Sequence, residues 1–242
     1  MLKLITPNWT APPNVKAYTT TRKGGDSQSP YSSLNLGDHV GDDPKAVAAN
    51  RATLRQLLPS EPAWLKQVHS IKIVTADPNA SNCSADASIT TELNKVCVVL
   101  TADCLPVLFC DRAGTTIAAV HAGWRGLAGG ILEATLQRFN KAPEDILVWL
   151  GPAIGPQDFE VGEEVRDSFT DYLPEATKAF KANRENHWLA DLYLLARQRL
   201  AHHGVTNVFG GEFCTYTNAE NFYSYRRDKI TGRMASLIWL DG

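Results

Sequence analysis

Residues 96–130 of the chain read VCVVLTADCLPVLFCDRAGTTIAAVHAGWRGLAGG. Cys104 follows the first apolar run in this stretch, and His121 ends the last one. A glycine-rich turn and a helical pattern over residues 127–139 come next. The apolar runs have the length of buried strands, which we expect at about 96–102, 106–110 and 115–120. The sequence therefore predicts a buried sheet that carries reactive side chains at the ends of its strands.

The sequence before this stretch predicts a strand, a long loop and a helix. An alternating run at 15–21 predicts the strand, and residues 24–41 are rich in Gly, Ser and Asp, which is typical of a long functional loop. Asp43 and Pro44 mark the start of a helix that continues to about residue 58.

Strands and helices are also expected around the rest of the chain. The runs at 63–70 and 71–77 predict a hairpin or a bulged strand that turns near His69. We expect helices at 163–172, 174–181 and 191–203, and further strands at 146–150, 205–211, 222–228 and 234–240. No repeat or linker divides the chain, so the pattern predicts an α+β fold in a single domain over residues 1–242.

Composition limits the class of protein. The chain has 242 residues, of which 44% are hydrophobic and 21% are charged, which is enough to bury a large core. Its apolar runs are far shorter than a membrane span and no signal peptide opens the chain, so we expect a cytoplasmic protein with no membrane partner. The net charge of −2 gives no reason to expect nucleic acid. Five cysteines without regular spacing predict reduced thiols.

Cys104, His121 and His69 form the first candidate site. One thiolate and two imidazoles make a three-ligand set for zinc with a fourth position open, as in catalytic zinc sites. The same residues could instead supply a cysteine nucleophile and its histidine base. An inert buried thiol with unrelated histidines is the plainer interpretation, because free cysteine is usually buried. The other histidines, among them His39, are expected in solvated loops or helix ends.

Arginines form the second candidate set. Arg22, Arg125 and Arg226 lie in glycine-rich or turn-like segments, where a guanidinium can bind an anion in a bidentate way. The turn after Gly123 also leads into a helix whose free N–H groups favour a phosphate. Most surface arginines are merely solvated or paired, so none of the three stands out alone.

The chain resembles the YfiH-like laccase-domain family over nearly its whole length. The motifs that carry the resemblance are TTRKGG, SSLNLGDHVGDDP, QVHS, TADCLPVLF, VHAGWRG, LGPAIGP and SYRRDKITGR. Members of this family were first named multicopper polyphenol oxidases and are now understood as zinc-containing purine nucleoside phosphorylases, with adenosine deaminase activity also attributed to them. The resemblance implies a mixed-sheet α/β/β/α layered sandwich rather than a Rossmann sheet.

The resemblance also implies the site. The family's metal ligands fall on His69, Cys104 and His121, with zinc as the expected metal and copper as the alternative. We expect Asp103 or a metal-bound water to transfer a proton to the departing base. The expected partners are purine nucleosides such as adenosine, inosine and guanosine, together with phosphate. We expect substrate-binding residues at Arg22, Asn35, Gln67, Arg125 and Arg226.

Phosphorolysis to a free purine and ribose 1-phosphate is the activity we expect. Phosphate would attack the anomeric carbon while negative charge grows on the departing base, so the site must hold an anion and stabilise the purine. Two other enzymes are kept as alternatives: a copper-dependent polyphenol oxidase, although six histidines are few for several copper centres, and a cysteine hydrolase or amidase that uses Cys104 and a histidine. A third alternative is a protein without catalytic activity, either one with a structural zinc ion or a binding module.

Overall fold

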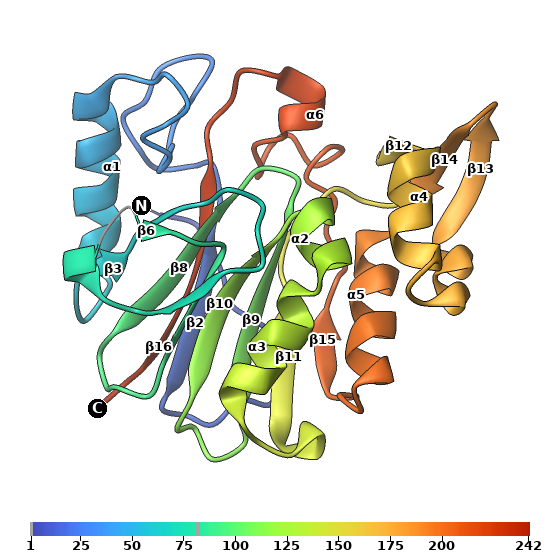
Figure 1. Ribbon diagram of the computed structural model, residues 1–242. Coiled ribbons are helices and arrows are strands. Elements are labelled where there is room, and N and C mark those ends of the chain that lie inside the picture. The colour runs from blue at the N-terminus through green and yellow to red at the C-terminus, as the bar shows by residue number, and fades with distance from the viewer. Residues whose placement is uncertain (1, 81–82) are drawn as a thin grey trace.

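The computed structural model describes residues 2–80 and 83–242. Two sheets stack face to face and helices cover their outer faces (Figure 1). The first sheet contains β1 (Leu4–Ile5), β2 (Val15–Thr20), β3 (Pro62–Ala63), β8 (Val96–Thr101) and β16 (Met234–Leu240). The second contains β5 (Ile73–Thr75), β7 (Ala87–Thr90), β9 (Leu105–Asp111), β10 (Ile117–Ala122), β11 (Ile146–Leu150) and β15 (Val208–Gly210).

Both sheets are mixed. Their orders are β1-β2-β16-β8-β3 and β15-β11-β9-β10-β7-β5. Most neighbouring strands are antiparallel. The parallel pairs are β3 with β8, β5 with β7 and β11 with β15. Smaller sheets join β12 (Glu160–Gly162), β13 (Phe180–Arg184) and β14 (His187–Ala190), and join β4 (Leu65–Lys66) with β6 (Cys83–Ser84).

Helices form the two outer layers. The helices are α1 (Pro44–Arg55), α2 (Trp124–Gly129), α3 (Ile131–Phe139), α4 (Glu163–Thr170), α5 (Leu192–His202) and α6 (Tyr225–Asp228), with 3₁₀ turns at Pro78–Ala80, Pro143–Asp145 and Pro174–Ala179. In Figure 1, α1 lies beside the first sheet, and α2, α3 and α5 lie on the second. The expected α/β/β/α sandwich is therefore confirmed. No helix of the described residues is both long and apolar enough to cross a membrane.

Alternation along the central strands explains the layers. In β8, Cys97 and Val99 face the other sheet, whereas Val98 and Leu100 face the layer of α1. In β9, Leu108 packs between the sheets and Phe109 packs toward α3. Successive side chains of a strand point to opposite faces, so a strand that is buried on both faces must be apolar throughout. This is why residues 96–120 contain such continuous apolar runs.

Several expected elements differ in the structure. The runs at 63–70 and 71–77 do not form a hairpin, because β4 pairs with β6 and β5 pairs with β7. The helix expected at 127–139 is two helices, since the backbone turns at Gly130 with φ 96°. The strand expected at 222–228 contains α6, whose start is capped by the Ser224 side chain accepting from the Arg227 N–H.

Residues 160–190 were the least predictable segment. The helix expected at 174–181 is a 3₁₀ turn followed by β13, and the sequence analysis missed all three strands of this small sheet. Its strands are short and largely polar, so they lack the apolar alternation that marks a strand. The reduced state expected of the cysteines agrees with the structure, in which all five are free.

Removing a side chain between the two sheets should destabilise the fold strongly. Leu108 is fully buried there, so Leu108→Ala should lower the free energy of unfolding by about 2–5 kcal/mol through lost burial and a cavity. Chemical denaturation followed by circular dichroism measures this loss. The control is Leu57→Ala at a side chain that is 49% exposed, and a similar loss in both variants would contradict the assigned core.

Candidate functional site

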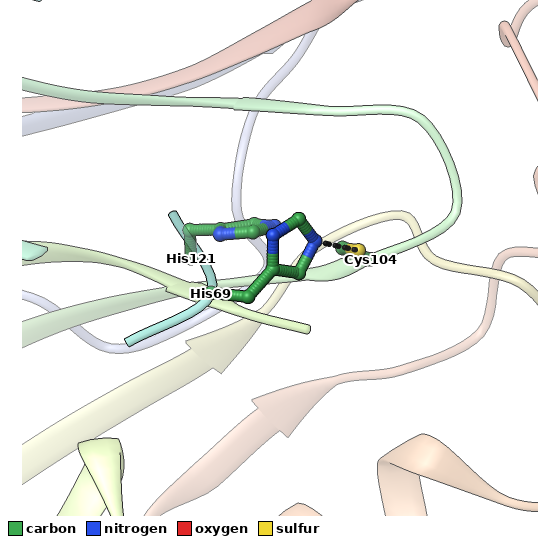
Figure 2. A group of neighbouring side chains, drawn as sticks. All are labelled: His69, Cys104 and His121. Carbon is green, nitrogen blue, oxygen red and sulfur yellow. Dashed lines mark hydrogen bonds between the residues drawn. The ribbon is translucent and has the colours of Figure 1, made fainter. Parts of the chain in front are cut away.

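Two loops and the end of one strand bring His69, Cys104 and His121 together at one end of the sheets (Figure 2). His121 lies near the end of β10, Cys104 lies in the turn between β8 and β9, and His69 lies in the loop after β4. Their ligand atoms all lie within 4.8 Å of one another. The Cys104 Sγ lies 3.8 Å from His69 Nε2. The three residues singled out in the sequence thus form one cluster.

A buried carboxylate, Asp86, positions both histidines. Its Oδ1 accepts a hydrogen bond of 2.8 Å from His121 Nδ1, so the second ring nitrogen of His121 is left with its lone pair for a ligand. The same carboxylate accepts from the backbone N–H of His69 at 2.9 Å and from that of Ser70 at 2.7 Å. His69 itself has φ 60°, a conformation that a residue with a side chain adopts only under such restraint.

The donor set fits a tetrahedral metal ion. Ligand atoms bound at about 2.0–2.3 Å to a tetrahedral zinc ion lie roughly 3.3–3.8 Å apart. The distance from Cys104 Sγ to His69 Nε2, 3.8 Å, is at the upper end of this range, and the ligand atoms of the whole cluster lie within 4.8 Å, so binding would draw them slightly together. Gly123 leaves the space that the ligands need, because a Cβ at this position would lie 2.8 Å from His69 Cδ2 and 3.2 Å from Cys104 Sγ. Among the described residues this is the one group of His, Cys, Asp or Glu side chains that can hold a metal ion.

Electrostatics favour the charged forms of these groups. Burial acts to raise the pKa of Asp86, but hydrogen bonds from His121 and Ser70 outweigh it and lower the pKa to about 2. Burial likewise acts against the Cys104 thiolate, yet the nearby imidazoles of His121 and His69 lower its pKa overall. Cys104 and Asp86 in turn raise the pKa of His121. Without metal, the site therefore favours a thiolate beside an imidazolium at neutral pH.

A cavity of about 450 Å³ opens in front of the three residues. This volume falls within the usual range of small-molecule sites. Besides the cluster, the cavity is lined by His39, Gln67, Leu100, Thr101, Ala102, Tyr225 and Arg233. Both ends of the Gln67 amide bind the backbone of Leu100, and its expected substrate-binding role stays a prediction. His39, expected only as a solvated loop residue, is exposed but also borders the cavity.

Asp103 and Arg226 line a second, smaller cavity that also touches Cys104. Asp103 has φ 86°, and its carboxylate accepts from the Thr215 hydroxyl at 2.6 Å and from the Arg226 backbone N–H at 2.6 Å. Through these contacts it holds α6 against the turn that carries Cys104. Its expected part in proton transfer stays a prediction.

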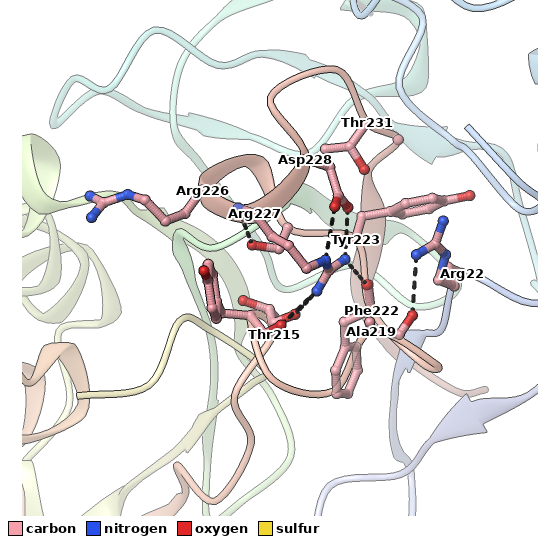
Figure 3. A network of polar contacts seen from close by, with 12 residues as sticks. Arg22, Thr215, Ala219, Phe222, Tyr223, Arg226, Arg227, Asp228 and Thr231 are labelled. Atoms are coloured by element: carbon pink, nitrogen blue, oxygen red, sulfur yellow. Dashed lines mark hydrogen bonds and ion pairs between the residues drawn. The ribbon is translucent and has the colours of Figure 1, made fainter. Parts of the chain in front are cut away.

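Arg22, Asn35 and Arg125 do not line either cavity. Arg22 donates to the carbonyls of Ser32 and Ala219 and lies over the ring of Tyr223 (Figure 3). Asn35 is fully buried, and its Oδ1 accepts from the backbone N–H of Arg233. Arg125 lies over the ring of Trp124. Their substrate-binding roles stay predictions, and the contacts of Arg22 and Asn35 are with the backbone of neighbouring loops.

Arg233 and Asp86 are site residues that were not expected from the sequence. Arg233 closes the SYRRDKITGR motif and lines the large cavity, and its Nη1 donates to the carbonyls of Thr231 and Gly232. Tyr225 lines both cavities. Asp86 lies in an ordinary-looking ADASIT segment, whose only signal was a charged residue directly before a buried strand.

Comparison with known proteins agrees with this geometry. Residues 16–241 match the family described as multi-copper polyphenol oxidoreductase laccase. The chain belongs to the YfiH-like laccase-domain family. Within this family, a protein of Escherichia coli strain K12 named purine nucleoside phosphorylase YfiH is 56% identical over 244 residues, covering 99% of this chain and 100% of the relative. A purine nucleoside phosphorylase of Pseudomonas aeruginosa is 54% identical and covers 98% of each chain.

Solved structures of the YfiH-like family share the fold. A Neisseria meningitidis protein superposes with a TM-score of 0.95 at 52% identity, over 99% of both chains. YlmD of Geobacillus stearothermophilus superposes with a TM-score of 0.89 at 33% identity, over 95% of this chain and 93% of YlmD. The layered sandwich is thus the architecture of the family as well as of this chain.

A methyl group at Gly123 should remove metal binding without unfolding the protein. Gly123 has φ −62°, which alanine adopts freely, so the strain in Gly123→Ala falls on the His69 ring. We expect zinc affinity to fall about tenfold or more, with a melting temperature of the metal-free protein within a few degrees of wild type. Competition with a chromogenic chelator measures the affinity. Unchanged zinc affinity would contradict the assigned ligand geometry.

The thiol of Cys104 should react unusually fast in chelator-treated protein. Its pKa is lowered, so the thiolate forms below the ordinary cysteine pKa of about 8.5 and the alkylation rate should level off near neutral pH. Cys97 and Cys110 supply slow controls, because burial raises their pKa to about 12. Mass spectrometry after iodoacetamide treatment at a series of pH values identifies the modified residue. A midpoint at or above 8.5 would show that the imidazoles do not stabilise the thiolate.

Proposed function

We propose that this protein is a zinc-dependent purine nucleoside phosphorylase with His69, Cys104 and His121 as the metal ligands. The observation that carries the proposal is a three-ligand cluster that opens into a cavity of nucleoside size. The names of relatives that are 54% and 56% identical support the reaction. We take residues 1–242 to act as one catalytic domain in the cytoplasm.

Zinc is proposed over copper because phosphorolysis transfers no electron. A zinc ion held by the cluster would supply a Lewis acid without redox chemistry beside the reacting nucleoside. A multicopper oxidase needs several copper centres, and the described residues contain one candidate metal group. Copper at this group with phenol oxidation remains the alternative outcome of metal analysis.

The chain's own residues would hold and orient the substrates. Arg233 reaches the large cavity with part of its guanidinium free for an anion, and His39 borders the same space. We therefore assign phosphate to this cavity and to Arg233, with Arg22, Asn35 and Arg125 supporting the surrounding loops. Orienting the phosphate against the anomeric carbon is the step by which such contacts accelerate the reaction.

Adenosine deamination is a second activity that we propose for the same site. In this reaction water attacks the C6 carbon of adenine. For that, adenosine would bind with C6, in place of the glycosidic bond, beside the open face of the metal ligands, where the large cavity admits water. An assay for ammonia release from adenosine in phosphate-free buffer tests this activity separately from phosphorolysis.

Loss of any metal ligand should abolish phosphorolysis. His69→Ala, Cys104→Ala and His121→Ala should each lower kcat/KM for inosine by about a hundredfold or more, because the metal and its orientation are lost together. Phosphate-dependent release of hypoxanthine and ribose 1-phosphate is the measurement, with elemental analysis of each protein. Cys83→Ala, at a half-buried cysteine outside the site, is the matched control.

The same experiment separates the alternatives. Full activity of chelated, metal-free wild type that disappears on alkylation of Cys104 would favour a cysteine hydrolase or amidase. Unchanged phosphorolysis in all three ligand variants would contradict the proposed site.

A further inference from the structure

A second cavity of about 130 Å³ adjoins the candidate metal centre on the other side of Cys104. Ala102, Cys104 and Tyr225 line both this small cavity and the large one, so the two cavities meet at these residues. A volume of 130 Å³ is well below the usual size of a site for a whole small molecule. The small cavity can therefore take one part of a nucleoside but not all of it.

The walls of the small cavity are apolar and aromatic. Trp124, Ile154, Phe159 and Leu192 line it, and Ile154 and Leu192 are almost completely buried. Trp124 begins α2 and Leu192 begins α5, so two helices hold these walls of the small cavity in place. Such walls bind a flat, weakly polar ring system by burial and stacking.

Arg226 supplies the polar contact at the rim. Its Nη1 donates to the carbonyl of Glu160 at 2.9 Å, and its guanidinium lies 5.4 Å from the centre of the Phe159 ring. In the described part of the chain, Nε and Nη2 of Arg226 contact no protein acceptor. Figure 3 shows the side chain extending away from the hydrogen-bonded cluster around Arg227. These free N–H groups can donate to ring nitrogen or carbonyl acceptors of a base.

The two cavities differ in charge. The lining of the small cavity combines Asp103 with Arg226, so its formal charges cancel and it offers a phosphate no net attraction. The lining of the large cavity contains Arg233 and His39 and no carboxylate. An anion is therefore favoured on the Arg233 side of Cys104, and an uncharged ring is favoured on the Arg226 side.

We propose that the small cavity binds the purine base, through Arg226 and the rings of Trp124 and Phe159, while ribose and phosphate occupy the large cavity. This inference rests on the proposed phosphorylase function. It moves Arg226 from phosphate binding to recognition of the base. The glycosidic bond then lies where the two cavities meet, at Cys104 and Tyr225, which places the bond to be broken beside the metal ligands.

Separate binding of the purine base and of phosphate tests the assignment without turnover. Calorimetry with hypoxanthine and equilibrium dialysis with labelled inorganic phosphate are carried out on the zinc-loaded full chain. Arg226→Ala and the conservative Phe159→Leu should each weaken hypoxanthine binding about tenfold or more and change phosphate binding less than twofold. Arg233→Ala should do the reverse. Arg166→Ala, which removes another arginine stacked on an aromatic ring, Trp188, is the matched control and should change neither.

Tryptophan fluorescence gives a second measurement that is independent of folding losses. Hypoxanthine should quench the emission of wild type, and Trp124→Phe should remove most of that quenching while retaining affinity within a fewfold. Hypoxanthine binding that is lost in Arg233→Ala but kept in Arg226→Ala and Phe159→Leu would overturn the proposal, as would the absence of hypoxanthine binding to wild type. Failure of the phosphorylase function itself is seen separately, as inosine that is not cleaved when phosphate is present.

Discussion

The carboxylate of Asp86 is the constraint on which the site depends. It is completely buried, and it accepts hydrogen bonds from the His121 ring and from the backbone of the loop that carries His69. A buried charge without such partners would cost several kcal/mol, so loop and strand are held around it together. The pKa of Asp86 is lowered to about 2 because these donors favour the charged form of its carboxylate. One side chain thereby sets the positions of two candidate ligands that are far apart in sequence.

The two stacked sheets place these loops at a common end. β8, β9 and β10 are apolar on both faces, so they are buried in the sandwich, and polar chemistry is possible only where they end. Cys104 and His121 lie at such ends. Gly123 then lets the chain pass directly behind the ligands on its way into α2. The sandwich makes the site rigid, and the turns at the strand ends leave the ligands accessible from the large cavity.

The arginines divide into those that build loops and those that face the cavities. Arg227 donates to the carbonyls of Thr215, Tyr216 and Phe222 and pairs with Asp228, and Arg22 binds two further carbonyls. These guanidinium groups satisfy backbone acceptors that the irregular loops leave unpaired. Among the described residues, Arg226 and Arg233 keep N–H groups without a protein acceptor, and both line cavities that border Cys104. The same residue type therefore has structural and recognition roles within one short motif.

The sequence by itself determined most strands of the sandwich, although not β1 or β7, together with α1 and its Asp43 cap, the family, and the three residues of the candidate metal cluster. Apolar runs and reactive residues at strand ends are local signals, so they can be recognised without a structure. It did not determine that β4 and β5 pair in different sheets, that Asp86 joins the histidines, or which arginines keep free donors. Those features depend on contacts between residues far apart in the chain, and only the packing of the two sheets decides which partners meet.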